Sequence, residues 1–401
     1  MQDHRRIFLR GIPQKAAYQN GEFIWPKQIP GGPAPTPSDK STPFYVENIS
    51  NDVEDVVISK QSYLEDNSYA NMAPTITIEK STDNENWETL GSTSSILHIY
   101  LDPGDKVYLR STADYWCEWV DYDDTSSLVE VHLHGIFWNS IVGCSKVGGN
   151  ILSLNYGSDF ASQNTMKGYD RVFTSIFSDI KNLITFNYSL VDASDLLLIS
   201  NISRYACYNG MFFGCASLKT APKLPATTLR PRCYYQMFRN CSSLVSSPAL
   251  PAQTVQGYSY YQMFHGCTRL TNIGQIDAVT LNDHSCALMF AQCDALQNAP
   301  LLGNVTTLGE YCFYYMFGDC DELVSPPSLP ASTLVTCCYY GMFSGCKKMT
   351  FLVCKATDGL DATNCVSYWT QDVAPAGTFT KMAGTNWPSG SIPDNWEIVE
   401  I

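Results

Sequence analysis

CYYQMFRNCSSLVSSPALPAQTV, residues 233–255, joins a Met-Phe pair, a cysteine four residues after the methionine and a tail with two prolines. No catalytic motif requires this combination, yet the chain repeats it. Met-Phe pairs stand at 211/212, 237/238, 263/264, 289/290, 316/317 and 342/343, with spacings of 26, 26, 26, 27 and 26 residues. A fixed period of this length is typical of a solenoid, whose units stack because none buries its apolar face alone.

The spacing of apolar residues within one repeat predicts a helix. When each repeat is numbered from its methionine (position 0), positions −4, 0, +4 and +7 fall on one side of a helix with 3.6 residues per turn. The prolines of the tail then end that helix. Each repeat is therefore expected to run helix, short strand, turn. The expected repeat core comprises Met211, Cys215, Met237, Cys241, Met263, Cys267, Met289, Cys293, Met316, Cys320, Met342 and Cys346.

The cysteines of the repeats are interpreted as small buried hydrophobes rather than as disulfides or metal ligands. A degenerate seventh unit, FTSIFSDIKNL (173–183), has Ile180 where the others have cysteine at position +4. Packed helices lie roughly 8 to 10 Å apart, whereas a disulfide needs Cα atoms within about 7 Å. Cys354 and Cys365, which lie outside the pattern, are the best disulfide candidates.

Position −2 carries tyrosine in four of the six repeats. It lies about 160° from the methionine stripe on a helix, so these rings are expected to face outward as an aromatic ladder. Exposed aromatic rings are candidates for protein or sugar contacts. The alternative is that the rings lie flat against neighbouring helices. The candidate partner-binding residues are Tyr235, Tyr261, Tyr314 and Tyr340.

Composition and motifs exclude several classes of function. The 401 residues carry a formal charge of −14, which disfavours nucleic acid as a partner. We find no G-x-S-x-G, H-E-x-x-H or P-loop motif, so no enzymatic activity and no cofactor are predicted. In VEVHLH (129–134), Glu130, His132 and His134 share one strand face, but a polar outer face is favoured over a metal site. No apolar run is long enough to cross a membrane.

The sequence divides into four parts, giving a multidomain α+β protein. Residues 1–43 form an N-terminal arm with a linker rich in proline and glycine. Residues 44–145 alternate in strand fashion and predict an immunoglobulin-like β-sandwich. The solenoid of helix-strand repeats follows over 146–365, and 366–401 form a β-rich C-terminal cap, since solenoids need their ends covered.

The pattern CYxxMFxxCxxL…aPxLPAxTL over residues 146–365 resembles the BspA-like branch of leucine-rich repeats. Such repeats are found in surface proteins of gut Bacteroidales and in virion proteins of their phages, including crAss-like phages. The resemblance implies display without catalysis, through adhesion, host contact or virion decoration. It implies a head-fibre, tail-fibre or capsid-decoration protein that presents its repeats to host-surface or mucin glycans.

The resemblance also gives the N-terminal arm a role. The apolar stretch Phe23, Ile24 and Trp25 is the candidate virion-attachment segment, which orders on a capsid protein or another fibre chain. A strand that pairs with its own domain is the alternative. The chain as given starts without an apolar run of signal-peptide length. We therefore expect a homo-oligomer located in the virion and assembled in the host cytoplasm, with a bacterial cell-surface or secreted adhesin as the alternative.

Overall fold

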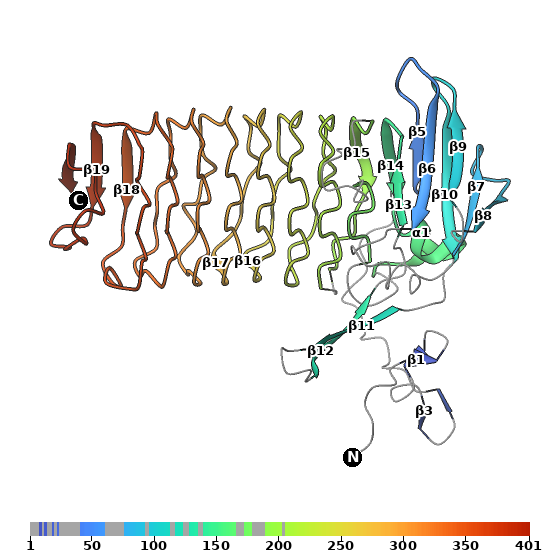
Figure 1. Ribbon diagram of the computed structural model, residues 1–401, viewed down its shortest axis with the longest axis horizontal. Coiled ribbons are helices and arrows are strands. Elements are labelled where there is room, and N and C mark those ends of the chain that lie inside the picture. Colours follow the sequence, from blue (N-terminus) through green and yellow to red (C-terminus); the bar gives the residue numbers. More distant parts are fainter. Residues whose placement is uncertain are drawn as a thin grey trace.

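The chain folds into a long solenoid with a β-rich domain at one end and the C-terminus at the other (Figure 1). This computed structural model describes residues 41–60, 76–92, 96–112, 139–165, 172–178, 189–202 and 205–401. It also describes the backbone of short strands at 8–9, 12–13, 18–19, 22–23, 117–122 and 128–134. One hydrophobic core runs from Phe44 in the β-rich domain to Trp396 near the C-terminus.

The β-rich domain contains two sheets that share this core. The larger has the order β15-β14-β5-β10-β7-β8, and the smaller β13-β6-β9. The strands of the larger sheet are β15 (Asp192–Leu197), β14 (Lys146–Asn150), β5 (Tyr45–Glu47), β10 (Lys106–Thr112), β7 (Thr77–Ser81) and β8 (Glu88–Ser92). Those of the smaller are β13 (Asn139–Val142), β6 (Glu54–Lys60) and β9 (Leu97–Leu101).

The larger sheet does not end where the expected sandwich ends. Strand β14 pairs antiparallel with β5 on one side and parallel with β15 on the other. The sheet therefore continues from the β-rich domain into the solenoid. This corrects the expectation of a separate immunoglobulin-like sandwich, because the parallel β14–β15 pair makes the two regions one sheet.

Three two-stranded pairs complete the N-terminal half. They are β1 (Phe8–Leu9) with β2 (Ile12–Pro13), β3 (Tyr18–Gln19) with β4 (Glu22–Phe23), and β11 (Cys117–Tyr122) with β12 (Leu128–His134). Of the candidate attachment segment, Phe23 ends β4, while Ile24 and Trp25 lie outside the described residues. Glu130, His132 and His134 belong to β12, whose side chains also lie outside the described part.

The expected helices of the repeats are absent from the described residues, so the α+β prediction was wrong. The described helical segments are α1 (Ser153–Tyr156) and the 3-10 helix η1 (Gly157–Ser162), both before the first Met-Phe repeat. In the repeats, main-chain donors alternate between two kinds of partner. The N–H of Met211 donates to Tyr208 O at 3.3 Å in a local turn, and that of Phe212 donates to Met237 O at 2.9 Å in the next coil.

A left-handed residue at every fourth position explains both this pattern and the error. In each repeat, the residues at −5, −1 and +3 have positive φ, as do Arg232 (57°), Gln236 (55°) and Asn240 (62°). A left-handed residue ends an α-helix, so the segment becomes a chain of four-residue turns. A period of four also places −4, 0 and +4 on one side. The expected core residues are indeed buried, but on turns instead of a helix.

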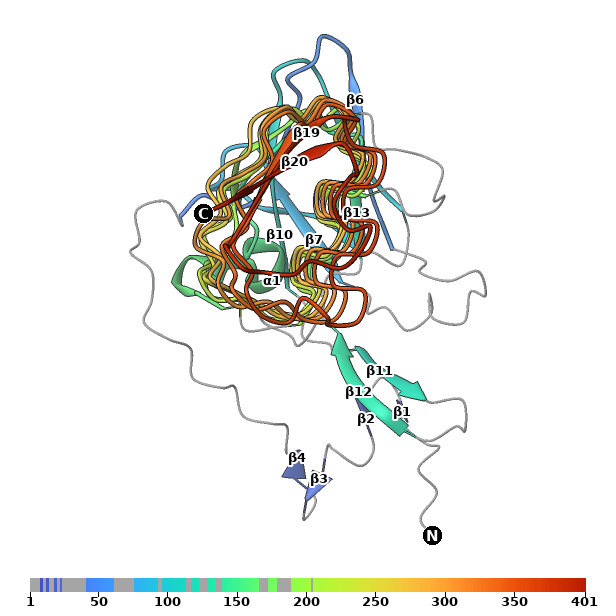
Figure 2. The same cartoon turned by 90° about the vertical axis from the view of Figure 1, so that its left-hand side faces the viewer.

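The other side of each coil pairs with its neighbours in parallel. Isolated bridges such as Ser246↔Asn272 and Asn298↔Ser325 join equivalent positions of adjacent coils. The short strands β16 (Thr254–Val255) and β17 (Thr280–Leu281) pair in the same way. At the C-terminal end, β18 (Phe351–Cys354), β19 (Gly377–Lys381) and β20 (Trp396–Glu400) form a parallel sheet. Seen end-on, the coils superpose on one another (Figure 2).

Stacked phenylalanine rings form a spine inside the solenoid. The rings at position +1 lie 5.2 to 5.6 Å from their neighbours between successive coils, and Phe44 of the β-rich domain stacks on the first at 6.0 Å. The members of the spine are Phe44, Phe177, Phe212, Phe238, Phe264, Phe290, Phe317 and Phe343. Adjacent coils are therefore spaced like neighbouring strands rather than like packed helices.

The cysteines at +4 form a second ladder beside this spine. Each thiol donates a hydrogen bond to the carbonyl oxygen of the phenylalanine one coil earlier, with S···O distances of 3.1 to 3.4 Å. The 15 cysteines of the described region whose side chains are placed are buried and form no disulfide bond. Cys354 and Cys365 are among them, so the disulfide considered between these two residues is not formed.

One coil follows the six Met-Phe repeats. In it, Trp369 takes the place of the methionine, because its carbonyl oxygen accepts from the N–H of Phe343 at 2.9 Å. Asn364, Tyr368 and Asp372 have positive φ at the −5, −1 and +3 places. Cys365 thus occupies position −4 of a terminal coil, and the solenoid continues past residue 365 to Asp372.

Candidate functional site

The tyrosines at position −2 lie on one flank of the solenoid in two stacked pairs. Tyr235 and Tyr261 have ring centroids 5.0 Å apart and an interplanar angle of 5°, and Tyr314 and Tyr340 are 5.2 Å apart at 17°. All four side chains are half-buried. Between the pairs, the coil with Ala287 at this position interrupts the column, so the four rings do not form one continuous ladder.

A second column, at position −5, bridges the interruption. The His284 ring is stacked between Tyr258 at 4.6 Å and Tyr311 at 4.7 Å. Tyr258 also packs against Tyr261 at 5.7 Å, and Tyr311 against Tyr314 at 6.0 Å. The two columns therefore join into one aromatic surface.

Further rings extend this surface towards the C-terminus. Tyr315 contacts Tyr314 at 4.9 Å, and Tyr368 of the terminal coil contacts Tyr340 edge-on at 5.4 Å. Tyr368 is the most open, with 57% of its surface exposed. We call the whole set the aromatic flank: Tyr235, Tyr258, Tyr261, His284, Tyr311, Tyr314, Tyr315, Tyr340 and Tyr368.

Stacking decides which part of each ring a partner can reach. Rings that stack along the solenoid axis cover one another's faces. A partner therefore meets ring edges and phenolic hydroxyls, which both donate and accept hydrogen bonds. Burial raises the pKa of Tyr235 and Tyr261, so these hydroxyls keep their protons at neutral pH.

Two arginines give the N-terminal part of the flank a positive charge. The Arg232 guanidinium lies 4.9 Å from the centre of the Tyr258 ring, a cation–π distance. Arg239 donates to Gln262 Oε1 at 3.1 Å, which also accepts from Gln236 at 2.6 Å. His265 is half-buried, and desolvation together with Arg239 lowers its pKa. These side chains lie beside the rings and can donate hydrogen bonds to a partner that is rich in oxygen acceptors.

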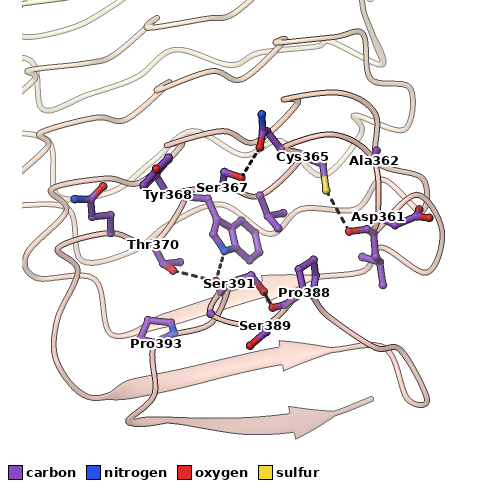
Figure 3. Close-up of a pocket in the computed structure, with 16 residues that line it drawn as sticks. Asp361, Ala362, Cys365, Ser367, Tyr368, Thr370, Pro388, Ser389, Ser391 and Pro393 are labelled. Carbon is purple, nitrogen blue, oxygen red and sulfur yellow. Dashed lines mark hydrogen bonds between the residues drawn. The ribbon is translucent and has the colours of Figure 1, made fainter.

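A second candidate site lies at the C-terminal end of the solenoid. A cavity of about 670 Å³ separates the terminal coil, residues 360–371, from the loop 388–393 (Figure 3). The indole N–H of Trp369 donates to the carbonyl oxygen of Ser391, and the hydroxyl of Thr370 donates to the same oxygen at 3.2 Å. The Trp369 ring stacks on Trp387 with centroids 5.3 Å apart. The loop is thereby fixed across part of the coil.

A single thiol lies among the described residues that line this cavity. It belongs to Cys365, which is 2% exposed and donates to Leu360 O at 3.4 Å. Burial raises the pKa of that thiol, which makes it a poor nucleophile. The described residues that line the cavity include no histidine. Across the described residues, no group of three or more His, Cys, Asp or Glu side chains is arranged to hold a metal ion.

Sequence reasoning identified four of the nine rings of the flank. It missed Tyr258, His284 and Tyr311, although three successive repeats carry a ring at position −5. That regularity is the signal that could have found them. Positions −5 and −2 are three residues apart and adjoin on a helix as they do on these turns, so the expected helix would also have placed the two columns side by side.

Comparison of the chain with protein-family models, curated proteins and solved structures finds no match. The described part of the chain has no helix long and apolar enough to cross a membrane.

Proposed function

We propose that this protein is a non-enzymatic structural and adhesion protein that presents the aromatic flank to glycans. The observation that supports this most directly is the continuity of nine aromatic rings across successive coils, from Tyr235 to Tyr368. Aromatic residues with a polar end are favoured where one side of a contact is apolar and the other is wet.

The architecture suits this role because it is rigid and repetitive. The phenylalanine spine and the inter-coil hydrogen bonds hold each coil on the next, so the rings keep their spacing without a ligand. A preformed surface loses little conformational entropy on binding. The row of tyrosine hydroxyls matches a polymer that offers hydroxyls and ring oxygens at regular intervals, and Arg232 and Arg239 add donors at one end of the row. Several linked copies would raise a weak affinity by multivalency.

The proposed setting is a phage particle, with the protein as a head fibre, tail fibre or capsid-decoration protein. The resemblance of the repeats to those of virion proteins supports this setting. We propose that the N-terminal region, with Phe23, Ile24 and Trp25, attaches to a capsid or other virion protein, and that the protein is a homo-oligomer. The solenoid leaves the β-rich domain in one direction, so attachment through the N-terminal region would project the flank outward (Figure 1). The alternative is a bacterial cell-surface or secreted adhesin.

Binding of the full chain to immobilised mucin tests the adhesive role. The variant combines Tyr261→Ser and Tyr314→Ser, which lie on either side of Ala287. The control is Tyr100→Ser, which removes a ring that is 70% exposed on β9, outside the flank. We expect the double variant to bind at least about tenfold more weakly and the control to bind like the parent. Equal binding by all three proteins would contradict the proposed role.

Location is tested separately. We expect peptides of this chain in the mass spectrum of purified phage particles, and surface labelling of those particles by an antibody raised against residues 205–350. Absence from particles together with labelling of bacterial cells would replace the virion setting with the adhesin alternative.

A further inference from the structure

The C-terminal face of the solenoid leaves a row of main-chain donors open. In the last Met-Phe repeat, five alternate N–H groups each donate to a carbonyl oxygen of the terminal coil at 2.9 Å. The pairs are Cys337 to Thr363, Tyr339 to Cys365, Gly341 to Ser367, Phe343 to Trp369 and Gly345 to Gln371. In this turn segment, each earlier Met-Phe coil donates to its successor in the same direction, so these alternate N–H groups point towards the C-terminal end.

The terminal coil has the same five N–H groups but no coil beyond it. None of them donates a hydrogen bond to a main-chain carbonyl oxygen of the described ranges. The cavity of about 670 Å³ is lined by four of the five residues that carry them, all but Asp372. The donors belong to Asn364, Val366, Tyr368, Thr370 and Asp372.

A second copy of the solenoid does not fit this face. Two terminal coils meeting end to end would set N–H against N–H, which cannot hydrogen-bond. Head-to-tail stacking would need open carbonyl groups on the first coil. There, Ile176 O already accepts from the N–H of Ile141 in β13 at 2.7 Å, so the β-rich domain covers that end.

The charge of the cavity excludes an anion as its natural occupant. Among the residues that line it, Asp361 is acidic and none is lysine or arginine. Asp372 follows directly at the end of the coil. Neutral carbonyl oxygens satisfy the open donors without this repulsion, and a polypeptide supplies them at alternate residues. The carboxylates at the two ends of the coil favour basic side chains on the incoming segment.

We propose that the terminal coil is a docking edge for a basic peptide segment of a partner protein, which adds to the solenoid as a further coil. The segment lies between the coil and the loop 388–393, and its carbonyl oxygens accept from Val366, Tyr368 and Thr370. Addition of a strand to an open sheet edge uses the same main-chain hydrogen bonds. This docking edge is independent of the aromatic flank and of any glycan binding.

A peptide from this chain can serve as the probe. Residues 229–243, LRPRCYYQMFRNCSS, cover the equivalent edge of an earlier coil, where their carbonyl oxygens accept from Tyr208, Gly210 and Phe212 at 2.8 to 3.0 Å. The probe carries Cys233→Ser and Cys241→Ser to prevent oxidation, and it brings three arginines towards Asp361 and Asp372. A scrambled peptide of the same composition is the control.

Hydrogen exchange of the full-length protein measures whether the main-chain amides of the docking edge are hydrogen-bonded. Without peptide, the amides of Val366, Tyr368 and Thr370 should exchange fast, while those of Tyr339, Gly341 and Phe343 are protected. With about 1 mM probe and a dissociation constant of about 0.1 mM, roughly one tenth of the edge stays free, so exchange of the first three amides should slow by about tenfold. The scrambled peptide should leave them fast.

A matched pair of variants tests whether the probe peptide binds in the cavity. Ser389 is exposed on the loop that borders the cavity, so Ser389→Trp fills part of it and Ser389→Ala does not. We expect the tryptophan variant to bind the probe at least about tenfold more weakly and the alanine variant to bind it normally. Amides that are already protected without peptide, protection that grows with protein concentration, no response to the probe, or equal binding by both variants would each overturn the proposal.

Discussion

The thiol of Cys267 donates a hydrogen bond to the carbonyl oxygen of Phe238, 3.1 Å away and one coil earlier. Both residues are fully buried, and four further Met-Phe repeats make the same contact at 3.1 to 3.2 Å. The cysteine at +4 therefore joins neighbouring coils as well as filling volume. From the sequence, the cysteines of the repeats were interpreted only as small side chains that fill the core.

Replacement of Cys267 should show both contributions. We expect Cys267→Ala to lower the free energy of unfolding by about 1 to 3 kcal/mol, because it removes buried volume and one of the two hydrogen bonds that the Phe238 carbonyl oxygen accepts. The control is Thr268→Ala at the exposed neighbouring position, where a change within about 0.5 kcal/mol is expected. Urea denaturation measures both. A loss no larger for Cys267→Ala than for the control would refute the contact.

Glycine at a left-handed position should stabilise the solenoid. Gln292 is exposed, lies at +3 and has a φ of 60°. The change Gln292→Gly relieves left-handed strain, so we expect the free energy of unfolding to rise by about 0.5 to 1 kcal/mol. In a helix, the same change would destabilise by about 1 kcal/mol. The sign of the change thus separates the two architectures.

The reverse change should be unfavourable at the equivalent position one coil earlier. Gly266 has a φ of 72°, and a Cβ atom there would collide with Oδ1 of Asn240. We expect Gly266→Ala to lower the melting temperature, and a scanning calorimeter would detect it. An unchanged or higher melting temperature would contradict the turn geometry.

The buried thiols should not react in the native protein. Burial raises the pKa of Cys267 and of Cys233 to about 12, so little thiolate forms at neutral pH. Titration with a thiol reagent should label few groups before denaturation and most of the 16 cysteines afterwards. Rapid labelling of the native protein, or blocked thiols after denaturation, would contradict the reduced and buried ladder.

Acid should weaken the aromatic flank through His284. Desolvation lowers the pKa of this ring below its ordinary value of 6.5, although Asp283 and Glu310 oppose the shift. As the pH falls below 6.5, the unfolded state takes up the proton first, so the free energy of unfolding decreases. His284→Phe keeps a ring between Tyr258 and Tyr311 but cannot be protonated. Its melting temperature should fall less than that of the parent between about pH 6.5 and pH 5. Parallel curves would exclude this role.

The repeat period could be read from the sequence, but the local structure could not. Met, Phe and Cys recur because each coil buries the same side chains in the same core. The recurrence of these residue types therefore reveals the period. The spacing of −4, 0 and +4 fits a helix and a chain of four-residue turns equally well. The distinguishing signal was the residue before the cysteine at +4, which is Gly214, Asn240, Gly266, Asp319 or Gly345 in five of six repeats. These residue types tolerate left-handed conformations.

The candidate sites were less predictable than the period. The aromatic flank combines positions −5, −2 and −1, which adjoin on a helix as well as on these turns. Of the three, only position −2 carries tyrosine in most of the repeats, and the rings at the other two positions were overlooked for that reason. The terminal coil was missed because Trp369 and Val373 stand where earlier repeats have methionine and cysteine. Its open donors are a property of backbone direction, which side-chain patterns do not reveal.

Footprinting of the tyrosines with bound glycan tests the central claim most directly, because it reports which side chains a partner covers. The full-length protein is exposed to hydroxyl radicals with and without soluble mucin glycans, and tyrosine oxidation is followed by mass spectrometry. The account predicts that Tyr235, Tyr340 and Tyr368 become protected by at least about threefold, whereas Tyr100 on β9 reacts as before. Equal oxidation of the flank in both samples, or protection confined to Tyr100, would contradict the claim that this flank is the binding surface.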